Sequence, residues 1–117
     1  MTAAEFRKLA LTCPEAEEAS HIGHPDFRVR GKIFATLGYP DARHGVLMLT
    51  PETQKSLLSD HPGVFIPAKG AWGRRGNTQV LLADAPITTV RSAMTVAWLK
   101  VAPKRVAKTF LEGGGRC

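Results

Sequence analysis

The sequence predicts an α+β fold, in which an antiparallel β-sheet carries helices on one face. Residues 27–37 alternate between apolar and polar side chains on either side of Arg30-Gly31, which is typical of a β-hairpin with a tight turn. Segments 3–12 and 87–101 repeat apolar residues every three or four positions, as amphipathic helices do. The predicted order is helix, several strands, helix, two strands and helices, and this order indicates an antiparallel sheet backed by helices.

The chain begins with a predicted helix over residues 3–12. Thr2 and Glu5 have the spacing of a capping box, in which the threonine caps the first turn and the glutamate reaches back. Pro14 ends this helix. Residues 15–22 then alternate charged and small side chains, which predicts a strand at a sheet edge, where charges discourage unwanted pairing.

The hairpin over residues 27–37 has one apolar and one polar side. The apolar side is predicted to carry Phe27, Val29, Ile33, Ala35 and Leu37, and the other side Arg28, Arg30, Lys32, Phe34 and Thr36. The three cations of the polar side could contact phosphate groups or simply face water.

A turn-rich loop over residues 38–45 leads to the apolar run Val46–Leu49, which is typical of a strand covered on both faces. Thr50 and Pro51 have the cap and first-turn preferences of a helix, which is expected to run to Asp60 and to bury Leu57 and Leu58.

The remaining elements follow without an internal repeat or a second domain. Residues 64–67 and 78–82 are predicted strands, separated by a glycine-rich loop over residues 68–77. Asp84-Ala85-Pro86 precedes the long helix, and residues 104–111 form a final basic turn or helix after Pro103. The predicted core of these elements comprises Phe6, Leu9, Val29, Ile33, Leu37, Leu47, Leu49, Leu57, Val80, Leu82, Val90 and Trp98.

At 117 residues the chain is expected to form a single domain over residues 1–112, with a flexible tail over residues 113–117. It has no secretory signal pattern and no apolar run near the roughly 20 residues that span a bilayer, so we expect a cytoplasmic protein. Cys13 and Cys117 are expected to be reduced thiols, because two distant cysteines make no disulfide framework.

The charge is unevenly distributed. The net charge is +6, and residues 27–117 hold fourteen Lys and Arg against five Asp and Glu, whereas residues 1–26 hold two against five. A basic body favours polyanionic partners such as nucleic acid, although a soluble protein can also be basic without such a partner.

Several segments resemble, in order, the MmcQ/YjbR family of small bacterial proteins. They are His24-Pro25-Asp26-Phe27, Gly31-Lys32-Ile33-Phe34-Ala35, Pro67-Ala68-Lys69 with Trp72-Gly73, and Ala97-Trp98-Leu99 leading into Val101-Ala102-Pro103-Lys104. Together they cover most of residues 2–111. The resemblance implies a CyaY-like α+β fold and a role as a DNA-binding protein of the double-wing type, with no catalytic residues and no cofactor. The sequence Arg74-Arg75-Gly76-Asn77 departs from the more neutral segment expected there. Iron binding of the frataxin type is not carried over with the fold, because this chain lacks a dense acidic ridge.

The candidate nucleic-acid-binding residues combine the basic hairpin side with the glycine-rich loop. They are Arg28, Arg30, Lys32, Lys69, Trp72, Arg74 and Arg75. The cations would contact phosphates and Trp72 would stack on a base, giving weak binding with little sequence preference. In the alternative interpretation the charges are solvated and Trp72 folds into the core.

Two other functions are compatible with a soluble basic domain. The chain could be a protein- or small-ligand-interaction module with no nucleic-acid role, in which Phe34 or Tyr39 would matter more than the arginines. An enzyme is not expected, because the sequence contains no recognisable catalytic motif, and a chance orientation would be needed for Asp26 to orient His24 as a base. His21 and His24 lack the further ligands of a metal site, so no bound metal is expected.

Overall fold

The computed structural model of the chain describes residues 1–114 and contains one six-stranded antiparallel sheet in the order β1-β2-β3-β4-β6-β5. The strands are β1 (Ala16–His21), β2 (His24–Val29), β3 (Lys32–Leu37), β4 (His44–Met48), β5 (Phe65–Pro67) and β6 (Asn77–Leu81). The helices are α1 (Ala3–Thr12), α2 (Pro51–Asp60), α3 (Gly70–Arg74), α4 (Ile87–Val101) and α5 (Lys104–Glu112), with a short 3₁₀ turn over Leu82–Asp84. The predicted α+β class is therefore confirmed.

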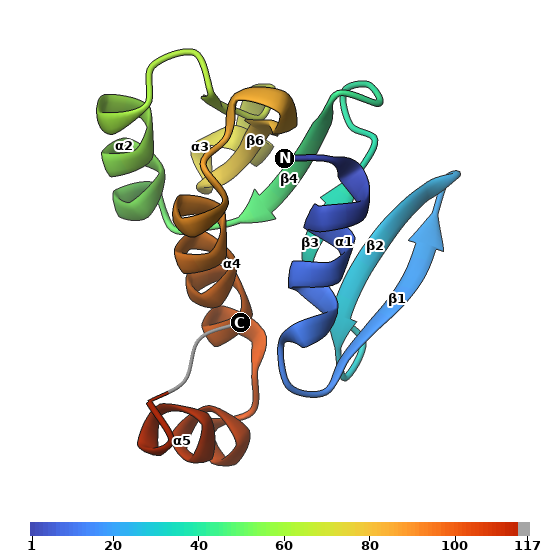
Figure 1. Cartoon of the computed structure of the whole chain (residues 1–117), viewed down its shortest axis with the longest axis vertical. Coiled ribbons are helices and arrows are strands. Elements are labelled where there is room, and N and C mark those ends of the chain that lie inside the picture. Colours follow the sequence, from blue (N-terminus) through green and yellow to red (C-terminus); the bar gives the residue numbers. More distant parts are fainter. Residues whose placement is uncertain (115–117) are drawn as a thin grey trace.

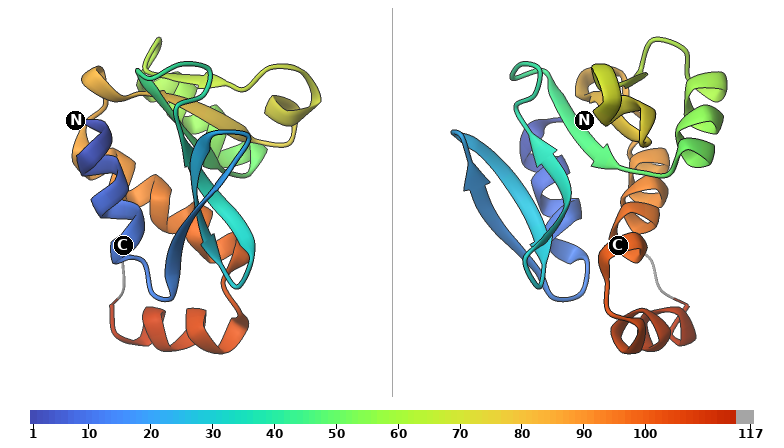
Figure 2. Two further views of the ribbon diagram at one scale, coloured as in Figure 1. Left: turned by 90° about the vertical axis from the view of Figure 1, so that its right-hand side faces the viewer. Right: turned by 180° about the vertical axis from the view of Figure 1, so that it is seen from behind.

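Helices α1 and α4 lie side by side on one face of the sheet (Figure 1). The one-turn α3 lies on the other side, which leaves much of that face without a long helix (Figure 2). The helix-covered face holds the core, with Trp98 of α4 fully buried and its Nε1 donating to the carbonyl O of Pro14 at 2.9 Å. The face without a long helix also carries a pocket.

The first helix and the central hairpin form as the sequence predicts. Thr2 and Glu5 make both hydrogen bonds of the capping box, and α1 has the predicted bounds. Val29 of β2 is paired with Lys32 of β3, so that Arg30 and Gly31 form a two-residue turn, with positive φ at both positions. Strand β1 is an edge strand, as predicted, and its residues are mostly exposed.

Some predicted core positions are wrong. Ile33 and Leu57 are only half-buried, as is Leu58, whereas Phe34 is fully buried instead of sharing an exposed side with the cations. The register of β2 against β3 shifts between Phe27 and Arg28, and such a bulge alters which residues of the hairpin are covered. In α2 the buried residue is Gln54, whose Nε2 donates to the carbonyl oxygens of Gly73 and Asn77, both at 3.0 Å.

Three other expectations concern the ends of the chain and its surroundings. Cys13 is buried and is not a free thiol, so the expectation of a reduced cysteine there is wrong, while Cys117 lies outside the described residues. Helix α5 ends at Glu112, but most of the expected tail over residues 113–117 also lies outside the described part. Within residues 1–114, no helix is both long enough and apolar enough to cross a membrane.

Candidate functional site

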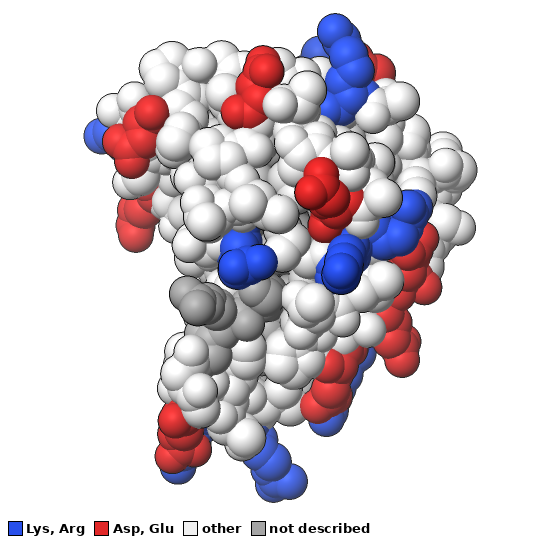
Figure 3. All heavy atoms as spheres, viewed as in Figure 1, with Lys and Arg blue, Asp and Glu red and all other residues white. Residues whose placement is uncertain are grey.

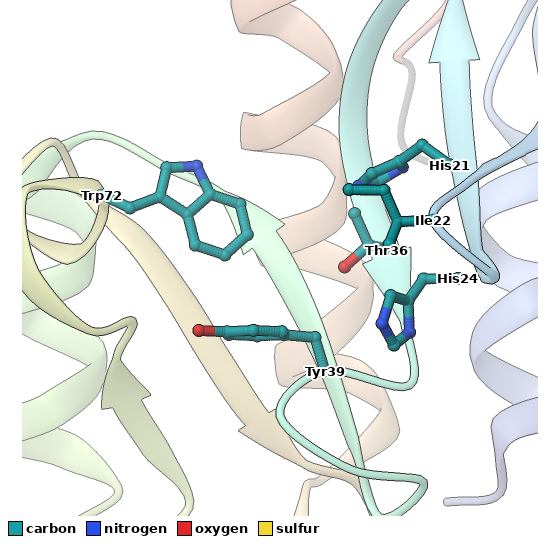
Figure 4. Close-up of a pocket in the computed structure, with 6 residues that line it drawn as sticks. All are labelled: His21, Ile22, His24, Thr36, Tyr39 and Trp72. Carbon is teal, nitrogen blue, oxygen red and sulfur yellow. The ribbon is translucent and has the colours of Figure 1, made fainter.

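A pocket of about 350 Å³ opens on the sheet face opposite α1 and α4 (Figure 4). Its lining comes from the turn between β1 and β2, from β3, from the loop after β3 and from α3. The lining residues are His21, Ile22, His24, Thr36, Tyr39 and Trp72. Imidazoles and a hydroxyl on one side therefore stand across the opening from two aromatic rings.

The polar side of the pocket is built on the tight turn between β1 and β2. His21 is paired with His24 across this turn, and Ile22 and Gly23 both have positive φ, 50° and 77°. This backbone conformation is uncommon for a β-branched residue such as isoleucine. Ile22 is also 92 % exposed at the rim of the pocket, so neither burial nor backbone preference explains an isoleucine here.

Behind the histidines lies a buried ionic network centred on Asp26. Its carboxylate accepts hydrogen bonds from Arg28 Nε at 2.6 Å, Arg28 Nη2 at 2.9 Å and His21 Nδ1 at 2.7 Å. The Arg28 guanidinium holds the pKa of Asp26 below its usual value, and the His21 contact acts in the same direction against the opposing effect of burial. The same contact raises the pKa of Arg28. An ionised Asp26 fixes His21 by Nδ1 and leaves Nε2 as the ring nitrogen that a ligand could contact.

Thr36 is a buried polar residue of the pocket. It is 2 % exposed, and its Oγ1 has no hydrogen-bonding partner among the described residues. Figure 4 shows this oxygen directed into the space between the histidines and the aromatic rings. Buried hydroxyls are normally hydrogen-bonded, so an open one at the wall of a pocket is a reason to look for a ligand there.

The aromatic side of the pocket is a contact between Tyr39 and Trp72. The two rings meet edge to face, with centroids 5.5 Å apart and an interplanar angle of 82°. Gly38, at φ 86°, precedes Tyr39, and a Cβ there would lie 3.2 Å from His24 Nδ1. Glycine at this position therefore allows the loop to approach the histidine closely.

Helix α3 holds Trp72 in place through close backbone packing. A Cβ on Gly73 would lie 1.7 Å from the carbonyl O of Ala68, and a Cβ on Gly76 would lie 2.3 Å from the carbonyl O of Leu49. Gln54 adds its hydrogen bond to the Gly73 carbonyl O. The predicted loop over residues 68–77 is thus a short ordered helix, and its Trp72 is a half-buried pocket residue and not part of the core.

The basic candidate residues fall into two separate groups. Arg28 is held by Asp26, and Arg30 is paired with Glu15 at 3.0 Å. Arg30 lies in the turn between β2 and β3, at the opposite end of these strands from the pocket, and Lys32 follows that turn. Lys69, Arg74 and Arg75 lie at the two ends of α3, around Trp72. Within residues 1–114, Lys32 and these three cations form no salt bridge. Only the second group therefore flanks α3, the helix that places Trp72 in the pocket.

On the face that carries α1 and α4, charges of both signs are mixed (Figure 3). Figure 3 shows Lys and Arg side chains there interspersed with Asp and Glu side chains. An interspersed surface of this kind does not concentrate positive charge at one place.

Sequence reasoning did not identify Ile22 and Thr36 as site residues, and it missed the contacts of His21 with Asp26 and of Tyr39 with Trp72. The histidine that contacts the Asp26 carboxylate is His21, and not His24 as considered from the sequence. The register of β1 against β2 places His21 opposite His24, two residues from Asp26. Within the described residues, no group of three or more His, Cys, Asp or Glu side chains could hold a metal ion.

Comparisons with known proteins support the fold. A family model described as YjbR matches residues 11–101. Among solved structures, the Deinococcus radiodurans protein DR2400, with the family-model domain DUF419, is similar to this chain with a TM-score of 0.70 at 18% identity. That similarity covers 92% of this chain and 86% of the other. No curated protein matches the chain at a significant level. The motif residues His24 and Trp72, far apart in the sequence, meet at the pocket.

Proposed function

Because the chain belongs to the YjbR family, for which DNA binding is expected, we propose that it is a cytoplasmic, non-enzymatic DNA-binding protein. It contacts DNA weakly and with little sequence preference. The contact surface is the α3 basic surface, which we define as Lys69, Arg74 and Arg75 at the two ends of the helix that carries Trp72.

The observation that carries this proposal is the position of these three cations. They flank one short helix, none of them is engaged in a salt bridge within residues 1–114, and the ring between them lines a pocket. Arg28 and Arg30, by contrast, are neutralised by Asp26 and Glu15. Free cations next to an accessible aromatic ring are the groups that bind phosphates and stack on bases.

The absence of a sequence preference follows from the chemistry of the contacts. Lysine and arginine bound to phosphate position a protein on nucleic acid without distinguishing the bases. Binding through about three such contacts releases few counterions, so the affinity is low and falls with salt.

A non-enzymatic role agrees with the way the polar groups are used. The carboxylate of Asp26 is shared between Arg28 and His21, and its charge is balanced by the guanidinium. This arrangement is that of a structural ion pair that orients an imidazole, and the sequence contains no recognisable catalytic motif.

Fluorescence anisotropy with labelled duplex and single-stranded DNA at two salt concentrations tests the proposal. The double variant Arg74→Ala/Arg75→Ala should weaken binding to every sequence alike and reduce the slope of log K against log salt by about 1–2. Lys104→Ala/Lys108→Ala removes the same charge from exposed positions of α5 and is the matched control, which should retain the slope at this site.

Two outcomes would contradict the proposal. Undetectable binding by the wild type at low salt would remove DNA as the ligand. Equal losses in the two double variants would mean that only the total charge matters and that α3 has no special role.

The pocket favours a second candidate function, that of a small-ligand-binding module without a nucleic-acid role. Its specific support is the buried Thr36 hydroxyl, which has no partner among the described residues. Binding of a neutral small ligand there would be largely insensitive to salt, whereas phosphate contacts are not. The salt titration therefore separates the two functions.

A further inference from the structure

We propose that the pocket binds one unstacked nucleobase of a single strand while the α3 basic surface binds the neighbouring phosphates. This inference rests on the proposed nucleic-acid function and adds to it a preference for unpaired strands. It assigns the pocket, and not only the surface cations, to the interaction.

The shape of the pocket suits a flat ring. Its volume of about 350 Å³ is near the lower end of the roughly 300–1,000 Å³ found for ligand pockets. Trp72 and Tyr39 form one wall with their rings at 82°, so a planar ligand can stack on one ring and meet the edge of the other. Such a wall favours an aromatic ligand over an extended aliphatic one.

The charge of the pocket suits a neutral ligand. None of the six lining side chains carries a permanent charge, and the adjacent Asp26 is compensated by Arg28. A phosphate or carboxylate would therefore lose its hydration without gaining a counter-charge inside the pocket. A nucleobase is neutral at physiological pH.

The polar side of the pocket suits the edge of a base. The Thr36 hydroxyl can donate and accept, and the Nε2 of His21 is left available because Asp26 holds Nδ1. His24 adds a second imidazole on the same side. A base presents donors and acceptors along its edge and an apolar π-face above and below, which matches this division of the lining.

The cations beside the pocket suit the sugar–phosphate backbone of the strand. Trp72 lies on α3, and Lys69 and Arg74-Arg75 stand at the two ends of that helix. A base stacked on Trp72 would hold its own sugar–phosphate backbone close to α3. A paired base in a duplex is enclosed in its stack and cannot enter a pocket without being unpaired.

The test compares two single strands of the same length and the same phosphate charge. One is a thymidine homopolymer, and the other carries a tetrahydrofuran abasic residue in place of every nucleoside. We expect the wild type to bind the base-bearing strand about tenfold more tightly, because stacking contributes on the order of 1–3 kcal/mol per base. The base-bearing strand should also quench the fluorescence of Trp72, whereas Trp98 is buried in the core and unaffected.

Thr36→Val tests the hydroxyl itself. It should lower the affinity for the base-bearing strand toward that for the abasic strand and leave the abasic affinity unchanged. Thr88→Val, at an exposed position of α4, is the control and should change neither affinity. A Thr36→Val protein that discriminates as well as the wild type would overturn the role of the hydroxyl and with it the base pocket.

The two levels of the proposal fail in different ways. Equal affinity of the wild type for the two strands, with no change in fluorescence, overturns the base pocket and leaves binding through phosphate in place. Failure to bind either strand at low salt overturns nucleic-acid binding itself, and the base pocket falls with it.

Discussion

Asp26 and Thr36 lie directly opposite each other on β2 and β3, but the Asp26 carboxylate accepts three hydrogen bonds, whereas the Thr36 hydroxyl makes none within residues 1–114. Both side chains are buried. The carboxylate of the pair is thus satisfied by the protein itself, whereas the buried hydroxyl of the pocket residue Thr36 has no partner among the described residues.

Replacing Thr36 with valine should therefore stabilise the fold. The substitution keeps the shape and removes a buried hydroxyl without a partner, so the free energy of unfolding should rise by about 1 kcal/mol in urea denaturation. Thr78→Val is the matched control, because Thr78 is a buried strand threonine whose Oγ1 donates to the Gly76 carbonyl O at 2.8 Å. The control should lose about 1 kcal/mol. A comparable loss in Thr36→Val would show that its hydroxyl is satisfied in solution.

Asp26→Asn should destabilise the fold. Asparagine has nearly the same shape but cannot balance the charge of Arg28. Its amide also has only one accepting oxygen, whereas the carboxylate has two. A loss of about 1–3 kcal/mol is expected, since hydrogen bonds to charged groups are involved. Asp84→Asn alters an exposed aspartate and should change the unfolding free energy by less than about 0.5 kcal/mol. Equal stability of the two variants would mean that the network around Asp26 contributes nothing.

The same carboxylate should make the fold sensitive to acid. The folded-state pKa of Asp26 lies below its usual value, chiefly because of the Arg28 hydrogen bond, so the folded state binds this proton less readily than the unfolded chain. Its contribution is fully present above the unfolded-state pKa of about 3.9 and is lost as the pH falls through the lower folded-state pKa. Urea unfolding of the wild type should weaken over this acidic range, and Asp26→Asn should show a shallower dependence. Parallel profiles for the two proteins would contradict this assignment.

Trp98→Ala should be among the most damaging single substitutions. The ring is fully buried, lies with its centroid 4.6 Å from that of Phe110, and donates from Nε1 to the Pro14 carbonyl O. A loss of about 3–5 kcal/mol is expected in urea unfolding. Trp72→Ala removes the same side chain from a half-buried position and should cost less. If Trp98→Ala lowered the free energy of unfolding less than Trp72→Ala does, the assignment of Trp98 to the core would be wrong.

Gly73→Ala should disturb the position of α3. The added Cβ would lie 1.7 Å from the Ala68 carbonyl O, which is backbone and cannot move without shifting the chain. A loss of about 1–3 kcal/mol is expected, together with weaker binding at the pocket because Trp72 moves. In Gly113→Ala the Cβ meets nothing closer than 3.6 Å. This variant should therefore keep both its stability and its binding, and it serves as the control. Unchanged binding in Gly73→Ala would separate α3 from the site.

The sheet and most helix bounds were predictable because their signals are local. The capping box of Thr2 and Glu5, the two-residue turn at Arg30-Gly31 and the cap of Thr50 all operate within a few residues. The five-residue α3 was missed because Gly70 and Gly73 within it, and Gly76 just after it, resemble a loop in sequence. What makes it a helix is close packing against Ala68 and Leu49 and the hydrogen bond of Gln54, and these are tertiary contacts.

The candidate site was only half predictable for the same reason. The charges of Lys69, Arg74 and Arg75 and the ring of Trp72 are visible in the sequence, but their separation from Arg30 and Lys32 is a property of the folded sheet. The pairing of Thr36 with Asp26 depends on register, and the burial of Phe34 accompanies a bulge between Phe27 and Arg28. Alternation alone assigns the wrong side to such a residue.

The origin of the pocket lining suggests that the contribution of α3 can be exchanged independently of the rest. The histidines, Thr36 and Tyr39 all come from the contiguous segment 21–39, whereas Trp72 alone comes from α3. A graft that replaces residues 70–75 with the equivalent turn of a relative would change the aromatic wall and leave the polar wall intact. Such a graft must retain Gly73, because any side chain there collides with Ala68, and Gly70, whose φ of 64° favours glycine. Segment 21–39 can thus be kept constant while residues 70–75 are varied, which offers a direct route to engineering the ligand preference of the protein.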